Sequence, residues 1–309
     1  MSRRTASAFS VRQPLKETSI PRRLLSLFYS LFAAPDAWAV NTLSFLAGRA
    51  SLMGEIHPFG VALVFIILRT GHRLRALSAT VGVLVGMATV AGTGPLFSVA
   101  AALLAAFIFH KAHKKTYDIS GWPGAIDLVG LLMITRLAEG YLIGITTRTV
   151  AVILLEAMMV LLATMLFAPL ARLVREEWPY RLHTEQLVSV GLAAVVVGMG
   201  LAGLSVGPIQ LCEVWNRWVT LVAALLGRGA IGAAQGVALG IMAELSSVRL
   251  LGGGVGVYGI SGLLGGLFSR GGKAGVVAGF FVGNLIASVQ AATGESIVIG
   301  FVHSLVAMV

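Results

Sequence analysis

Apolar stretches, many of them long enough for a membrane span, alternate with short basic or glycine-rich turns along most of the chain. This pattern is typical of membrane-spanning helices, because a hydrocarbon core of about 30 Å needs about 20 apolar residues with their backbone hydrogen bonds made internally. The chain shows no alternation of apolar and polar residues over stretches of about ten residues, which is the pattern typical of an outer-membrane barrel. The pattern therefore predicts an all-α, polytopic helical bundle of about 10 to 12 spans.

The chain divides into a tail and a membrane domain. Residues 1–36 are expected to form a basic cytosolic tail with an interfacial segment, and residues 37–309 the multi-span domain. Pro58 disfavours helical geometry at His57 and can begin a new helix, so a first span at 38–54 is predicted to bend at 55–58. Further spans are expected at 58–68, 76–91, 96–110, 126–143, 150–170 and 273–288, and a last one from 297 to 309 looks incomplete.

Composition supports this reading. Hydrophobic residues make up 57% of the 309, charged residues 12%, and mean hydropathy is +0.90, which excludes an ordinary soluble domain. The net charge is +10, with basic residues gathered in the tail and in turns such as 69–75, 111–115 and 269–273. The positive-inside bias places these segments and the N-terminus in the cytosol, so the charge needs no nucleic-acid partner.

A few charged residues stand inside apolar sequence. A guanidinium at the bilayer centre costs roughly 2.5 to 3.5 kcal/mol, so Arg49 is expected to face protein or water. Arg49 and Glu55 could meet across the bend as an ion pair that fixes helix register; an ion or substrate site and snorkelling are the alternatives. Arg136 and Glu139 are three residues apart and share a helix face, which fits a structural pair or, with Glu156, a proton or ion relay.

Glycine becomes dense in the second half. Glycines spaced by four lie on one helix face and let two backbones approach closely, so these are predicted to be helix-packing positions. The run at 252–259 lacks the Lys and Ser/Thr of a phosphate-binding loop. The single Cys212 permits no internal disulfide, and no Cys/His constellation predicts a metal or other cofactor. The packing positions are Gly232, Gly236, Gly240, Gly262, Gly266, Gly275, Gly279 and Gly283.

Four segments, in order, resemble the membrane region of the stage II sporulation protein E family. They are FLAGRASLMGEIHPFG at 45–60, AGLSVGPIQ at 202–210, RGAIGAAQGVALGIM at 228–242 and SGLLGGLFSRGGKAGVVAGFFVGNLIAS at 261–288. The resemblance implies a membrane region followed by a cytosolic region that contacts the division protein FtsZ. A PPM-type serine phosphatase domain, which holds Mn or Mg, comes last. That enzyme dephosphorylates an anti-anti-sigma factor and so activates the forespore sigma factor.

No catalytic residue of such a phosphatase can be placed on this chain, which looks truncated before the two cytosolic regions. The resemblance therefore implies a membrane anchor that targets the enzyme to the polar sporulation septum in the cell membrane. FtsZ and the phosphorylated factor would be partners only through the missing regions; the lipid bilayer and self-association remain for this part. A stand-alone transporter or channel, or a membrane sensor, is the alternative.

Overall fold

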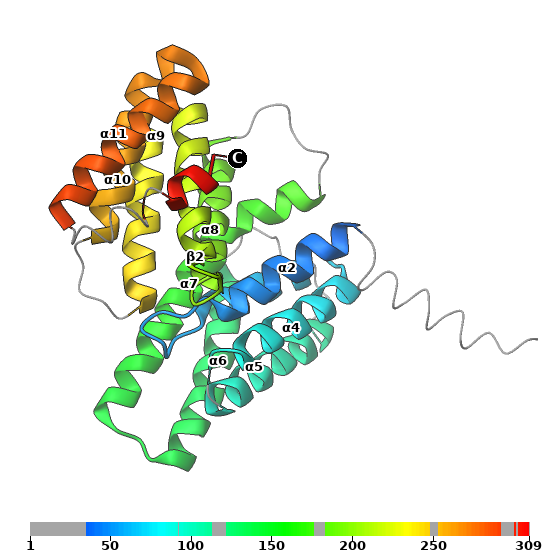
Figure 1. The fold of residues 1–309 in the computed structure, drawn as a ribbon. Helices are drawn as coiled ribbons and strands as arrows, with labels where there is room; N and C mark the ends of the chain where they lie inside the picture. The colour runs from blue at the N-terminus through cyan, green and yellow to red at the C-terminus, as the bar shows by residue number, and fades with distance from the viewer. Residues whose placement is uncertain are drawn as a thin grey trace, which may run out of the picture.

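The all-α architecture is visible throughout the part of the chain described by the computed structural model. That part comprises residues 35–91, 93–112, 122–175, 183–247, 253–291, 300 and 302–308 (Figure 1). Most of the predicted N-terminal tail lies outside it. The helices are α2 (Pro35–Arg49), α3 (Pro58–Arg69), α4 (Arg73–Ala88), α5 (Thr93–Ala112), α6 (Trp122–Ile143), α7 (Thr147–Arg175), α8 (Thr184–Gly200), α9 (Leu211–Ser247), α10 (Gly253–Leu267) and α11 (Gly272–Ala291). A 3-10 turn, η2 (Phe268–Gly271), precedes α11, and a short hairpin of β1 (Ser205–Val206) and β2 (Ile209–Gln210) precedes α9.

The bend after the first helix begins earlier than the sequence predicts. α2 ends at Arg49, not at residue 54, and the following turn is closed by backbone hydrogen bonds between Leu52 and Ile56. Met53 and Gly54 have φ of 53° and 71°, a left-handed conformation that no helix continues. Pro58 starts α3, as expected from its fixed φ and missing N–H.

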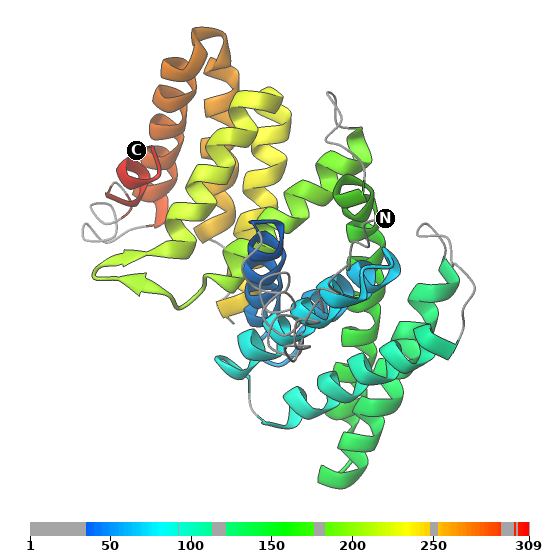
Figure 2. The same cartoon turned by 90° about the vertical axis from the view of Figure 1, so that its right-hand side faces the viewer.

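α9 is a helical hairpin. Its two arms meet at Arg228, whose φ of 59° and ψ of −160° are not helical. A Cβ built on Gly232 would lie 2.9 Å from the Cα of Ala224, eight residues away, which requires the chain to double back. Figure 2 shows the two arms side by side. Each arm is therefore only about half as long as the whole element.

Close backbone contact joins α2 to α4. A Cβ at Gly82 would lie 3.1 Å from the Asn41 carbonyl oxygen, and one at Gly86 would overlap the carbonyl of Phe45. From the first pair to the second the residue number rises by four on both helices, so α2 and α4 run in the same direction. This contact was not predicted, although Gly82 and Gly86 have the same spacing of four as the predicted packing glycines.

The second half packs through the predicted glycines. A Cβ added at any of the eight would meet backbone atoms of a neighbouring segment closer than real Cβ contacts allow. Gly232 on α9 and Gly262 on α10 face each other's carbonyl groups, and Gly279 on α11 faces that of Leu264. The glycines therefore set the spacing of α9, α10 and α11, which lie together in Figure 1.

The largest buried cluster joins the two halves of the molecule. It takes side chains from α2, α3, α7, α8 and both arms of α9, including Ala47, Phe59, Phe167, Val196 and Leu239. A second cluster takes its side chains from the five helices α3 to α7, and a third lies between α9 and α11. α8 contacts α2, α7 and α9, so it connects the first group of helices to the glycine-packed group.

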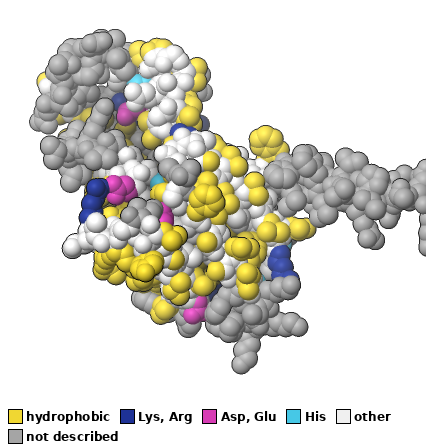
Figure 3. All heavy atoms as spheres, turned by 90° about the horizontal axis from the view of Figure 1, so that it is seen from below, with side chains coloured by type: hydrophobic (Ala, Val, Ile, Leu, Met, Phe, Trp, Pro, Cys, Tyr) yellow, Lys and Arg dark blue, Asp and Glu magenta, His cyan; other side chains and the backbone are white. Residues whose placement is uncertain are grey.

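The outer surface is rich in apolar side chains. In Figure 3 hydrophobic atoms cover much of the face seen from below, with few charged ones. By length and composition, two described helices, at Thr147–Leu170 and Leu211–Ser246, could cross a membrane, although the second is the α9 hairpin. Only 39% and 28% of their 18-residue apolar stretches are buried, whereas the core helix of a soluble protein is mostly buried.

The packing role of Gly262 predicts a stability difference between two glycines of the same helix. In Gly262→Ala the new Cβ would overlap the backbone of Gly232, so the variant is expected to lose about 1 to 3 kcal/mol of unfolding free energy. Gly256→Ala is the matched control, because a Cβ there meets nothing within 4 Å and alanine favours a helix. Thermal unfolding of both variants in one detergent tests this; equal midpoints would contradict it.

Candidate functional site

Arg49 joins the ends of three helices and does not pair with Glu55. From the last turn of α2, its Nε donates to the Gly200 carbonyl at 2.8 Å and its Nη2 to the Ala202 carbonyl at 3.1 Å. Its Nη1 donates to Thr89 Oγ1 at 2.5 Å, just beyond α4. The expected Arg49–Glu55 ion pair is therefore wrong: the guanidinium is held by carbonyls at the C-terminus of α8, where the helix dipole favours a cation.

Glu55 pairs instead with Arg148 at the start of α7. Both side chains are well exposed, at 48% and 78%, so this ion pair contributes little to stability. The Met53 N–H donates to the Leu245 carbonyl at 3.0 Å. The 50–57 turn therefore contacts both the α6–α7 hairpin and the end of α9.

A buried ion cluster lies between α6 and α7. Arg136 forms a bidentate pair with Glu156, Nε to Oε2 at 2.7 Å and Nη2 to Oε1 at 2.8 Å, and its Nη1 reaches Glu139 Oε2 at 3.1 Å. Glu156 is 1% exposed and Arg136 8%. The structure therefore brings Arg136 and Glu139 together, as their spacing indicates, and adds Glu156 from the facing helix as the stronger partner.

A cavity of about 570 Å³ opens beside this cluster. Its lining includes Glu55, Glu139, Glu156 and Arg136, together with residues of the 50–57 turn and the first two turns of α7. Arg136 is already bound by two carboxylates. Its main role is therefore to neutralise the negative charge of Glu156 and Glu139 between α6 and α7. The relay hypothesis stays a prediction.

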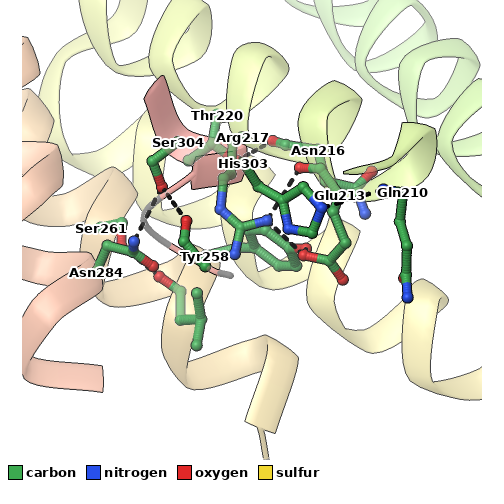
Figure 4. Close-up of polar contacts among 12 residues, drawn as sticks. Gln210, Glu213, Asn216, Arg217, Thr220, Tyr258, Ser261, Asn284, His303 and Ser304 are labelled. Carbon is green, nitrogen blue, oxygen red and sulfur yellow. Dashed lines mark hydrogen bonds and ion pairs between the residues drawn. The ribbon is translucent and has the colours of Figure 1, made fainter. Parts of the chain in front are cut away.

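A second polar cluster, which was not predicted from the sequence, lies between α9 and α10 (Figure 4). Glu213 accepts a hydrogen bond from the Tyr258 hydroxyl at 2.6 Å and forms an ion pair with Arg217, four residues on. The Arg217 guanidinium also lies 5.6 Å from the centre of the Tyr258 ring. The Glu213 carboxylate and the aromatic ring offset the desolvation of the Arg217 guanidinium, which is only 5% exposed, and the hydroxyl satisfies the carboxylate in turn.

This cluster reaches the helical segment at 302–306. His303 Nε2 accepts the backbone N–H of Gln210 at 3.0 Å, so in its neutral form this histidine carries its proton on Nδ1. Asn284 on α11 donates to Ser304 Oγ at 2.9 Å, and Ser304 donates to the Gly300 carbonyl at 2.9 Å. Figure 4 shows His303 beside Arg217 and Glu213. The helical segment at 302–306 is thus tied by hydrogen bonds to β2, just before α9, and to α11.

One signal in the sequence could have found this cluster. Glu213 and Arg217 are four residues apart in an otherwise apolar helix, the spacing at which a carboxylate and a guanidinium meet. Nothing local predicts the contribution of Tyr258, which comes from another helix.

In the described part of the chain no three His, Cys, Asp or Glu side chains come together as a metal site, so these residues do not fit the Mn or Mg of a phosphatase.

The fold and these clusters define a class of protein: an all-α chain with glycine-packed helices, an apolar outer surface and buried ion pairs between helices. The chain belongs to the family described as SpoIIE, N-terminal domain, whose profile matches residues 3–309.

One curated relative is the stage II sporulation protein E of Bacillus subtilis (strain 168), 28% identical over 271 residues. The aligned region covers 86% of this chain and 32% of the relative, so the chain spans about a third of the relative's length. No solved structure matches the chain at a significant level.

Two of the three glutamates at the cavity, Glu156 and Glu55, are expected to differ in their effect on stability. Glu156→Gln removes the main partner of a buried guanidinium and should lower the unfolding free energy by about 3 kcal/mol. Glu55→Gln, the control, removes only an exposed pair and should cost at most about 1 kcal/mol. Thermal unfolding of the two variants in one detergent compares them, and a larger loss for Glu55→Gln would refute the assignment.

Proposed function

We propose that this chain is the membrane domain of a stage II sporulation protein E type phosphatase, which it anchors and positions at the polar sporulation septum. The observation that carries the proposal is the family match over residues 3–309, combined with a relative of which the aligned region covers only 32%. The remaining two thirds of such a relative are where we place the enzyme. This chain would supply location and not catalysis.

The surface and the helix ends support a polytopic arrangement with a cytosolic N-terminus. If α2 leaves the cytosol and each following helix, including each arm of α9, reverses direction, then the 50–57 turn, Thr89, the 144–146 turn, Gly200 and Leu245 all belong at the outer face. Contacts join several of these segments: Arg49 with Thr89 and Gly200, Glu55 with Arg148, and Met53 with Leu245. The predicted parity therefore agrees with which helix ends lie together.

The partners proposed for the whole protein follow from the same family. A PPM-type phosphatase domain would bind Mn or Mg and act on a phosphorylated anti-anti-sigma factor, and a neighbouring cytosolic region would contact FtsZ. We place the metal and both protein partners in the part of such a relative that this chain does not cover. The described residues gather no group of metal ligands that would argue for a metal here. The bilayer, and a second copy of the chain, are the partners proposed for this part.

Localisation tests the anchoring role. A fluorescent protein fused to residues 1–309 is expected to concentrate at the polar septum in sporulating cells, because the proposed targeting information lies in the membrane domain. Fluorescence microscopy with a membrane dye provides the comparison, and a fusion to the α6–α7 hairpin alone is the control. Uniform fluorescence of the 1–309 fusion around the cell would refute septal targeting by this domain.

Cysteine labelling tests the proposed topology. In a Cys212→Ser background, Thr146→Cys in the exposed 144–146 turn should react with a membrane-impermeant maleimide on intact spheroplasts. Gly271→Cys, exposed in η2, should react only after permeabilisation, since this turn is predicted to be cytosolic. The reverse pattern would show that the orientation is wrong, and labelling of both sites on intact spheroplasts would contradict the reversals between them.

A further inference from the structure

Arg228 occupies a backbone conformation that suits glycine. It stands at the turn of the α9 hairpin with φ 59° and ψ −160°, a region that L side chains rarely adopt, and it lies between Gly227 and Gly229. Its side chain is exposed. Glycine would adopt this conformation without strain, so an arginine at this position costs conformational free energy.

Two more cations lie at the same tip of the molecule. Arg270 is in η2 and Lys273 is in the first turn of α11, and both are exposed. The end of α10 packs on the α9 turn so closely that a Cβ at Gly266 would overlap the backbone of Gly229, which brings the two turns together. Among the ion pairs formed by described residues, none involves Arg228, Arg270 or Lys273.

No carboxylate balances this charge from the connecting sequence. Between residues 228 and 273 the one acidic residue is Glu244, near the far end of the second α9 arm, where it accepts the Gly254 N–H at 2.6 Å. The turns of α9 and η2 lie together at the top of Figure 1, away from α2 to α6. The tip therefore presents three cations with a local positive potential.

Exposed apolar side chains flank these cations. Leu226 is 78% exposed, Leu267 61% and Phe268 53%, and each stands two or three residues before a basic residue of the tip. A phospholipid offers both matching parts, an anionic headgroup for the cations and acyl chains for the apolar collar. A soluble anion would use the cations alone and leave the collar in water.

From this combination we infer that the tip formed by Arg228, Arg270 and Lys273 binds the headgroup of an anionic phospholipid in the cytosolic leaflet, with Leu226, Leu267 and Phe268 against its acyl chains. The inference rests on the membrane placement proposed above. It assigns a lipid class to one end of the α9–α11 group, which the family match does not.

The test uses the whole chain in nanodiscs of phosphatidylcholine, with or without phosphatidylglycerol. Phosphatidylglycerol is expected to raise the thermal midpoint of the wild type, and Arg270→Gln/Lys273→Gln should lose most of that increment without touching the strained residue. Arg228→Gly should unfold at the same or a higher temperature than wild type in phosphatidylcholine, because strain is relieved, yet gain less from phosphatidylglycerol. Arg148→Gln, an exposed arginine at the α7 end, should keep the full increment.

Each other outcome has a distinct meaning. An increment retained by both Arg228→Gly and Arg270→Gln/Lys273→Gln would overturn the assignment, as would loss of the increment in Arg148→Gln. Inorganic phosphate that stabilised the wild type in phosphatidylcholine as strongly as phosphatidylglycerol would show an anion site and overturn the lipid. A chain that stayed soluble without detergent or lipid would instead refute the membrane placement, and with it the proposed function.

Discussion

The arrangement of the helices depends on the buried guanidinium of Arg49. It is 9% exposed, and its three hydrogen bonds bring the end of α2 to the ends of α4 and α8. Carbonyls at a helix C-terminus lack intrahelical partners and carry the negative end of the dipole, so each side of this contact satisfies the other. The adjoining 50–57 turn contacts α7 and α9, so the first and second halves of the chain are joined around one cation.

Within each half the helices are packed mainly by different means, although α2 and α4 in the first half also meet through glycines. In the first half, α3 to α7 pack through larger side chains such as Phe65, Leu103 and Leu128, and a bidentate ion pair links α6 to α7. In the second, glycines bring backbones into direct contact between α9, α10 and α11. In a bilayer, where apolar burial gives little advantage over lipid, such close contact is a main source of attraction, and it leaves large apolar side chains free to face outward.

The sequence predicted what depends on local pattern and missed what depends on distant partners. The positions of α4 to α7 and α11, the start of α3 at Pro58 and the packing glycines follow from hydropathy, proline geometry and spacing. The partner of Arg49 did not, because Gly200 lies 151 residues away and offers a backbone carbonyl, which no side-chain pattern marks. For the same reason Tyr258 could not be assigned to Glu213 before α9 and α10 were placed together.

The distribution of charge separates structural from external roles. The buried charged groups Arg49, Arg136, Glu156 and Arg217 all have hydrogen-bonded partners, because an unpaired charge there would cost several kcal/mol. Arg228, Arg270 and Lys273, by contrast, are exposed, and no described ion pair involves them. An exposed cation is solvated by water and needs no internal partner, so these three are free to meet a charged group outside the chain. The strained Arg228 among them fits the proposed contact with the membrane surface, where the positive-inside bias already expects cations.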